Sequence, residues 1–165
     1  MPLSTPIDSK DVLRKWVERT PKSKKLHEKA KKLMPLGVES HYRAIDPHPI
    51  FIERASGINI EDADGNVYMD FGMWFGALFV GHAHPQILAA IQAQAKEGTM
   101  YTMPHRHDLD LAQELISRFP MDLVRFTNSG TEATMHSIRL ARGYTQRNKI
   151  IKFEGAFHGC HDYVL

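Results

Sequence analysis

The residues best suited to chemistry lie in a short turn between an apolar run and a helical pattern. Ser129, Gly130 and Thr131 make this turn, directly after the run Leu123 to Phe126. A helix N-terminus offers backbone N–H groups that have no partner inside the helix, together with the positive end of the helix dipole. Gly130 lets an anion approach the backbone, and the two hydroxyl groups add donors. The pattern indicates a phosphate site, while a structural helix cap is the alternative for Thr131.

A second loop follows the same helix. The strand-like run Lys149 to Phe153 leads into a loop that carries Phe157 and His158. Strand, helix and strand make a βαβ unit, in which ligands bind beyond the carboxyl ends of the strands. We therefore expect the two loops to open on one crevice, one holding a phosphate and the other an aromatic ring. Glu132 is expected to position the first loop or favour the helix dipole, since it would repel a phosphate.

The histidines invite a metal hypothesis. The chain has ten of them, and three pairs are closely spaced: His82 and His84, His105 and His107, and His158 and His161. None of these pairs lies in a convincing strand, and none comes with a close acidic residue or cysteine in a zinc-binding pattern. We predict no metal site, although a metal hydrolase remains a third interpretation of the function.

The elements that must position these loops are read from periodicity and chain breakers. A polar segment, 1–33, is expected to form an N-terminal arm or helix, and Pro35 and Gly37 end its pattern. Short strands follow at Ile50 to Ile52, Gly57 to Ile60 and Asn66 to Phe71, with Asp64 and Gly65 as a hairpin turn. The sequence thus predicts a small antiparallel meander, and the segment 34–75 is assigned to a small domain.

The segment 76–165 is expected to begin a larger domain. The aromatic stretch Phe71 to Val80 should be a buried connection that lines a pocket. Pro85 should open a helix that Gly98 closes, and Asp108 should cap a helix that ends before Pro120. Helices then alternate with strands, which is an α/β pattern. Two parallel strands cannot cover both faces of a core without further crossovers, so we expect exposed strand edges, exposed apolar faces and a tendency to aggregate.

Composition describes an ordinary soluble globular protein, with 42% hydrophobic and 24% charged residues. The net charge of +2 is too small to argue for binding to nucleic acid. Cys160 is the only cysteine, which excludes an internal disulfide and favours a reducing cytoplasm. No apolar run has the length needed to cross a bilayer.

Several segments together resemble the class III pyridoxal-phosphate aminotransferases, and most nearly the glutamate-1-semialdehyde aminomutase branch. The resemblance rests on Met34 to Val38, Asp62 to Asn66, Gly81 to Pro85, Asn128 to Ala133, Arg139 to Arg142, Lys149 to Gly155 and Phe157 to Gly159. It implies an α/β fold of the aspartate-aminotransferase type, fold type I of the pyridoxal 5'-phosphate (PLP)-dependent transferases. In that fold a small antiparallel meander precedes the start of a mostly parallel large-domain sheet.

The resemblance also implies roles for particular residues. Ser129, Gly130 and Thr131 would hold the phosphate of PLP, the Phe157 ring would stack on its pyridine plane, and His158 would lie close to it. Phe157 as a plain core residue and His158 as an exposed loop residue are the alternatives.

On the substrate side, Arg43 would meet a carboxylate, and Trp74 and Phe75 would line the same pocket. A surface ion pair for Arg43 and plain core packing for the two aromatic residues remain open. His41 and Tyr42 replace the proline and valine of the family pattern, which makes a different amino acid or an amine a plausible substrate.

The activity implied is the transfer of an amino group between substrates or within one, by a homodimer. An ω- or β-amino-acid transaminase is the alternative to an aminomutase. In the family the lysine that forms the Schiff base lies downstream of the Phe157–Gly159 loop, so no catalytic residue is assigned here. We expect the N-terminal portion of an aminotransferase that is inactive alone, and a non-catalytic PLP-binding or assembly fragment is the further alternative.

Overall fold

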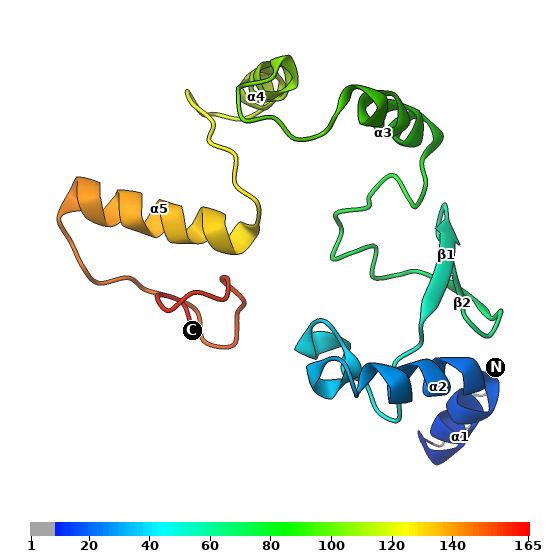
Figure 1. Cartoon of the computed structure of the whole chain (residues 1–165). Coiled ribbons are helices and arrows are strands. Elements are labelled where there is room, and N and C mark those ends of the chain that lie inside the picture. Colours follow the sequence, from blue (N-terminus) through cyan, green and yellow to red (C-terminus); the bar gives the residue numbers. More distant parts are fainter. Residues whose placement is uncertain (1–8) are drawn as a thin grey trace, which may run out of the picture. The chain divides into compact units, whose positions relative to one another are not determined.

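The computed structural model describes residues 9–165. These residues form two compact units, and the boundary between the units falls between Thr99 and Met100. Figure 1 gives the order of the elements. The residues 1–8, in which the predicted N-terminal arm begins, lie outside the described part. Within residues 9–165, none of the helices combines the length and the apolar character that a bilayer crossing requires.

The first unit opens with two helices, α1 (Ser9–Arg19) and α2 (Pro21–Ala30). Pro21 separates them because proline is favoured in the first turn of a helix, where its missing N–H costs nothing, and disfavoured in a helix interior. Two short 3₁₀ turns follow, η1 (Pro35–Gly37) and η2 (His41–Arg43). The expected break at Pro35 and Gly37 is therefore present, and Gly37 has a φ of 70°.

A three-stranded antiparallel sheet follows, with the strand order β1-β2-β3. The strands are β1 (Ile52–Ser56), β2 (Asn59–Asp62) and β3 (Val67–Met69). The predicted meander is present with its turn at Asp64 and Gly65, although β1 begins where the first predicted strand was expected to end. The reason is pairing: Arg54, Ala55 and Ser56 lie opposite β2, whereas Ile50 and Phe51 lie before the ladder.

Two aspartates order the turn between β2 and β3 and connect this turn to α2. Asp64 accepts hydrogen bonds from the backbone N–H groups of Lys22, at 2.7 Å, and Ser23, at 3.0 Å, and so caps α2 from a distant turn. Asp62, only 2% exposed, accepts from the backbone N–H of Asn66 at 2.8 Å and from the hydroxyl of Tyr68 at 2.8 Å. This polar network orders the hairpin turn and docks it on α2.

The carboxylates and phenol of this network titrate abnormally. Burial acts to raise the pKa of Asp62, but hydrogen bonds from Asn66, Tyr68 and Asp64 outweigh burial and lower the pKa. Burial also acts to raise the pKa of Asp64, but the hydrogen bonds from the backbone N–H groups of Lys22 and Ser23 outweigh burial and lower this pKa. Burial, reinforced by the hydrogen bond to Asp62, raises the pKa of Tyr68 to about 12.

The aromatic stretch between residues 71 and 80 is not buried, contrary to prediction. Phe71, Phe75 and Phe79 are 89%, 82% and 87% exposed. The stretch is a run of bends and turns rather than a strand or helix. Apolar composition therefore gave the wrong burial here, since these three side chains stay exposed even though Tyr42 contacts the edge of the Phe75 ring.

The first unit ends with α3 (Pro85–Glu97). The predicted limits are confirmed, since Pro85 is the first residue of the helix and Gly98 ends it with a φ of 103°. The second unit contains α4 (Arg106–Arg118) and α5 (Gly130–Thr145).

The predicted cap of α4 was wrong by one turn. His105, not Asp108, occupies the capping position, and its ring accepts a hydrogen bond from the backbone N–H of His107 at 3.3 Å. Asp108 lies in the first turn and accepts from the backbone N–H of His105 at 3.0 Å. This reciprocal capping box explains the error, because its acidic residue sits three positions inside the helix. The helix ends before Pro120, as expected.

The runs Leu123 to Phe126 and Lys149 to Phe153, predicted as strands, contain no strand or helix and pair with no described segment. The predicted pairing of these two runs as strands of a βαβ unit is therefore absent among residues 9–165. Their apolar side chains stay open: Leu123, Ile151 and Phe153 are 88%, 100% and 78% exposed. The expected exposed apolar side chains are therefore present in the second unit, whereas the expected strand edges are not, because no strand forms among its described residues.

Candidate active site

Helix α5 begins at the predicted turn. Ser129 is its N-cap in an extended conformation, and the hydroxyl of Ser129 accepts a hydrogen bond from the backbone N–H of Glu132 at 3.1 Å. Thr127 also contributes, since its hydroxyl donates to the backbone carbonyl of Ser129 at 3.1 Å. The first turn of α5 is thus ordered by side chains of its own loop.

The start of α5 retains free donors. Within the part of the chain that the structure describes, the backbone N–H groups of Gly130 and Thr131 have no acceptor. A Cβ atom added at Gly130 would meet nothing within 4 Å, so the space beside this backbone is open. The hydroxyl groups of Ser129 and Thr131 each accept a hydrogen bond and keep their own hydrogen for donation. Two amides and two hydroxyls at a helix N-terminus suit an oxyanion.

Glu132 is held by the loop that precedes the helix. Its carboxylate accepts hydrogen bonds from the backbone N–H of Asn128 at 2.9 Å and from the amide side chain of Asn128 at 3.2 Å. The backbone hydrogen bond from Asn128 is the main cause that lowers the pKa of Glu132. The Glu132 carboxylate therefore binds the loop that precedes the helix, in agreement with the expectation that Glu132 positions this loop.

The two predicted loops meet at the start of α5 (Figure 1). The backbone N–H of Cys160 donates to the hydroxyl of Thr131 at 3.2 Å, and the ring nitrogen Nε2 of His161 lies 3.1 Å from the hydroxyl of Thr134. Gly159 makes this approach possible, because a Cβ there would lie 2.9 Å from the Thr134 hydroxyl and its φ is 116°. Both loops thus border the same end of α5, as the βαβ argument requires.

Phe157 and His158 occupy this second loop. The Phe157 side chain is 79% exposed, so most of its ring surface is accessible within the second unit. His158 is half-buried, and its Nε2 atom is buried without a hydrogen-bond partner among residues 9–165. A buried ring nitrogen without a partner is costly, which makes it available to a ligand.

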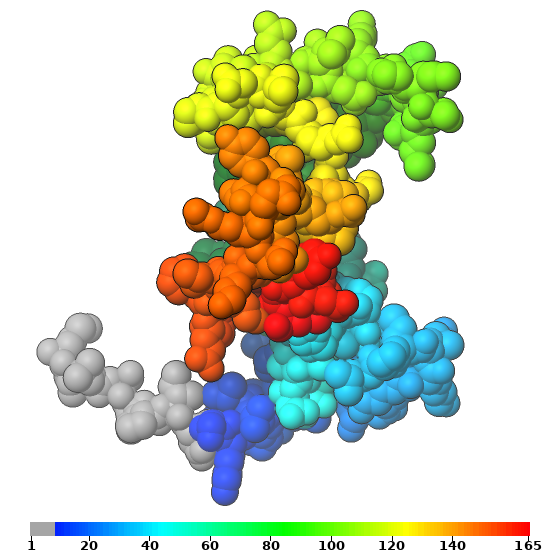
Figure 2. Space-filling model, turned by 90° about the vertical axis from the view of Figure 1, so that its left-hand side faces the viewer, coloured from blue at the N-terminus to red at the C-terminus, as the bar shows by residue number. Residues whose placement is uncertain are grey.

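The last residues hold the loop against the helix. The guanidinium of Arg142 lies 4.5 Å from the centre of the Tyr163 ring, and the Lys152 ammonium donates to the backbone carbonyl of Val164 at 2.9 Å. In the space-filling view the terminal segment, in red, lies against the yellow-orange surface of α5 (Figure 2). These contacts limit the freedom of the loop that carries Phe157.

The predicted substrate residues gather in the first unit. Arg43 lies over the Trp74 ring, with its guanidinium carbon 4.9 Å from the ring centre, and the Trp74 and Phe75 ring centres are 6.2 Å apart. Tyr42 closes the group, since its ring meets Phe75 edge-on at 5.5 Å. We call these four residues the Arg43 cluster. A hollow of about 460 Å³ adjoins it, lined by residues that include Val38, Glu39, Tyr42, Arg43, Ile45 and Ile50.

Two partners of Arg43 were missed from the sequence. Its Nη1 atom forms an ion pair with Glu39, and its Nε donates to the Tyr42 hydroxyl at 2.9 Å. The hydrogen bond with Tyr42 raises the pKa of Arg43, and the charge of Glu39 adds to this. The spacing of four residues between Glu39 and Arg43 is the signal that could have identified the ion pair. Arg43 therefore forms an ion pair, which was the alternative to its predicted role in binding a substrate carboxylate.

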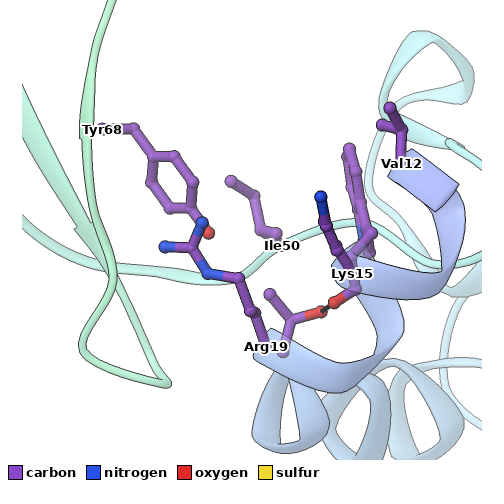
Figure 3. A pocket seen from close by; sticks show the side chains of 7 residues that line it. Val12, Lys15, Arg19, Ile50 and Tyr68 are labelled. Atoms are coloured by element: carbon purple, nitrogen blue, oxygen red, sulfur yellow. Dashed lines mark hydrogen bonds between the residues drawn. The ribbon is translucent and has the colours of Figure 1, made fainter. Parts of the chain in front are cut away.

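A separate hollow of about 370 Å³ lies beside α1 and contains none of the predicted site residues. Figure 3 shows the side chains that line it, including Arg19, which points toward Tyr68. Its two cations already have partners: Lys15 is ion-paired with Asp11 at 2.8 Å, and Arg19 donates to the side chain of Asn66 at 3.1 Å. These contacts are structural. No group of three or more metal-ligating side chains occurs among residues 9–165.

Comparison with known proteins identifies the class. The family model "Aminotransferase class-III" matches residues 41–165. The chain therefore belongs to the class-III aminotransferase family, and its α/β fold is that of the class-III transaminases.

Three known proteins illustrate the likeness. A glutamate-1-semialdehyde 2,1-aminomutase of Methanothermobacter thermautotrophicus is 48% identical over 145 residues, which cover 87% of this chain and 34% of that protein. The crystal structure of an omega-transaminase from Sphaerobacter thermophilus matches with a TM-score of 0.84 and 41% identity, over 88% of this chain and 34% of the other. A transaminase with PLP bound matches with a TM-score of 0.84 and 39% identity, over 87% and 34%. The chain thus spans about a third of the length of such relatives.

Proposed function

We propose that this chain forms the phosphate cradle for PLP and one wall of the substrate pocket in a PLP-dependent aminotransferase or aminomutase. The observation that carries the proposal is the start of α5. There, two unpaired backbone N–H groups and two hydroxyl donors, from Ser129, Gly130 and Thr131, border the loop of Phe157. The likeness to a transaminase with PLP bound supports the choice of this phosphate ligand.

Each residue has a stated part in this proposal. Gly130 and Thr131 bind the phosphate through their backbone N–H groups, and the hydroxyls of Ser129 and Thr131 complete its coordination. Phe157 stacks on the pyridine ring and sets its plane, and the unpartnered Nε2 of His158 faces the same ligand. PLP, when bound, serves as an electron sink for amino-group transfer. The lysine that such chemistry requires is expected outside the region of the relatives that this chain matches, so the chain alone is expected to be inactive.

Arg43 is proposed to bind the substrate carboxylate. Its guanidinium offers paired donors, and the aromatic rings of Trp74, Phe75 and Tyr42 provide an apolar wall beside it. Such a wall suits an amino acid with an apolar side chain, or an amine, as well as an amino-aldehyde. The likeness to an omega-transaminase supports an ω- or β-amino-acid transaminase as the second candidate function.

Two properties of the whole protein are also proposed. A homodimer accords with the family resemblance and with the exposed apolar side chains of the second unit. The single cysteine favours a reducing cytoplasm. A non-catalytic role in PLP binding or assembly remains the alternative for the chain by itself.

A binding titration tests the cradle without requiring turnover. PLP is compared with pyridoxal, which lacks the phosphate, by equilibrium dialysis against the chain. The proposal requires PLP to bind more tightly, and S129A to weaken PLP binding more than pyridoxal binding. S137A, on the same helix with a hydroxyl bonded to the carbonyl of Ala133, is the matched control and should change neither. Equal affinity for PLP and pyridoxal would contradict the phosphate assignment.

A further inference from the structure

Asp70 and His82 form a side-chain pair that closes the loop 71–81. The Nε2 atom of His82 lies 2.7 Å from a carboxylate oxygen of Asp70, and the two side chains are 19% and 17% exposed. We call this contact the Asp70–His82 clasp. The loop that it closes carries Trp74 and Phe75, two members of the Arg43 cluster.

Backbone hydrogen bonds fasten both ends of the loop to the turn between β1 and β2. The N–H of Asp70 donates to the carbonyl of Ile58 at 2.8 Å. His82 and Gly57 exchange two backbone hydrogen bonds, of 2.8 and 2.9 Å. A Cβ at position 81 would lie 2.9 Å from the carbonyl oxygen of Gly57, so this close approach requires Gly81. The loop is therefore anchored at its ends by backbone contacts, and the clasp lies across them.

The second oxygen of Asp70 turns the chain toward Trp74. It accepts hydrogen bonds from the backbone N–H groups of Gly72 at 2.8 Å and Met73 at 2.9 Å. The hydrogen bond with His82 is the main cause that lowers the pKa of Asp70, and the one with Met73 is next. One carboxylate therefore holds His82 on one side and the first turn of the loop on the other.

The residues that follow adopt conformations that need such support. Met73, Trp74 and Phe75 have φ values of 39°, 51° and 55°, in the left-handed region that side chains other than glycine rarely occupy. Three consecutive residues in this region persist only where the surroundings determine the backbone. Trp74 then places its ring under the Arg43 guanidinium. The hydrogen bonds of Asp70 are the contacts nearest to the start of this turn.

We propose that Asp70 and His82 are positioning residues, which hold the loop 71–81 so that Trp74 and Phe75 form the wall of the Arg43 cluster. The functional meaning rests on the proposed role of Arg43 in substrate binding. The clasp itself touches none of the reacting groups. It acts through the backbone of Gly72 and Met73, and thus sets the shape of the substrate pocket.

The chain supplies its own reporter for a test. It has two tryptophans, Trp16 and Trp74, so W16F leaves Trp74 as the only tryptophan, whose emission is excited selectively over that of the tyrosines. Quenching of Trp74 by acrylamide is measured in the full chain for D70A, H82A and the conservative variant H82Q. Glutamine can place an amide N–H where His82 has Nε2, so H82Q is expected to keep the clasp.

The expected result is a graded one. Trp74 is 56% exposed, so its release raises quenching by at most about twofold in D70A and H82A. H82Q should stay close to the parent. Quenching of Trp16, measured in a W74F background, should not change in any variant. Parent-like quenching of Trp74 in both D70A and H82A would overturn the proposal.

A second comparison is used if the alanine variant H82A loses its fold. If H82A also changes the Trp16 signal, H82N is compared with H82Q, since both are polar but the shorter asparagine amide stops short of Asp70. Higher quenching of Trp74 in H82N than in H82Q supports the clasp, and equal quenching refutes it. The fluorescence measurement needs no PLP. Failure of the PLP titration would therefore refute the phosphate cradle without affecting the result for the Asp70–His82 clasp.

Discussion

The backbone N–H of Cys160 donates a 3.2 Å hydrogen bond to the hydroxyl of Thr131. This bond joins two loops that lie 29 residues apart in the chain, one at the start of α5 and the other just after Phe157 and His158. The hydroxyl of Thr131 thereby becomes the link between the proposed phosphate cradle and the proposed ring-binding loop. Because the Thr131 hydroxyl accepts this bond, its own hydrogen is free to donate to an anion. One side chain thus serves both the proposed phosphate cradle and the proposed ring-binding loop.

Replacement of Thr131 by valine should weaken both functions of this hydroxyl. Valine keeps the shape but leaves the N–H of Cys160 without its acceptor, so amide exchange at Cys160 should become faster. A hydrogen bond to a charged group contributes about 1.5–3 kcal/mol, so PLP affinity should fall about tenfold or more. Hydrogen exchange and PLP dialysis measure the two effects. T145V, at the other end of α5, is the control, and an equal change in T145V would refute the assignment.

Replacement of Gly159 by alanine should destabilise the second unit. The added Cβ would lie 2.9 Å from the hydroxyl of Thr134, and its φ of 116° is unfavourable for alanine. We expect a loss of about 1–3 kcal/mol in urea unfolding. G143A, within α5 where a Cβ meets nothing within 4 Å, should instead stabilise by about 0.5–1 kcal/mol. Effects of the same sign in both variants would contradict the close approach of the two loops.

The first unit should lose stability in acid through Asp62 and Asp64. The folded state lowers both pKa values from 3.8, so their contribution is complete above that pH and is lost as the pH falls through the lower folded-state values. D64N removes one of these carboxylates. Its unfolding free energy should therefore be lower near neutrality and should depend less on pH below about 4. D122N, which alters an exposed aspartate outside the network, should keep the parental acid profile.

Removal of Glu39 should strengthen the binding of carboxylates at Arg43. Glu39 occupies one side of the Arg43 guanidinium, and a substrate carboxylate must compete with it. An exposed ion pair contributes about 0–1 kcal/mol, so E39Q should tighten binding by up to about fivefold. Titration of propionate, followed by Trp74 emission in a W16F background, measures this affinity. E61Q breaks a similar ion pair, between Arg54 and Glu61, and should leave the affinity unchanged. A gain in E61Q equal to that in E39Q would count against competition at Arg43.

Local signals in the sequence were sufficient for several elements. Proline at a first helical position and glycine just past a last one mark α3, because these residues have strong backbone preferences of their own. The turn at Asp64 and Gly65 and the start of α5 at Ser129 are local in the same sense. The motif residues that place the chain in the class-III aminotransferase family were likewise legible without coordinates, since they form contiguous segments.

Only the tertiary structure decided which distant residues meet. The bond between Cys160 and Thr131, the capping of α2 by Asp64 and the clasp between Asp70 and His82 each join residues that no periodicity relates. Burial was also decided there, because the aromatic run at Phe71–Val80 has the composition of a core but lies in turns that leave Phe71, Phe75 and Phe79 exposed. Local backbone preference is written into each residue, whereas contact and burial depend on the other segments that fold against it.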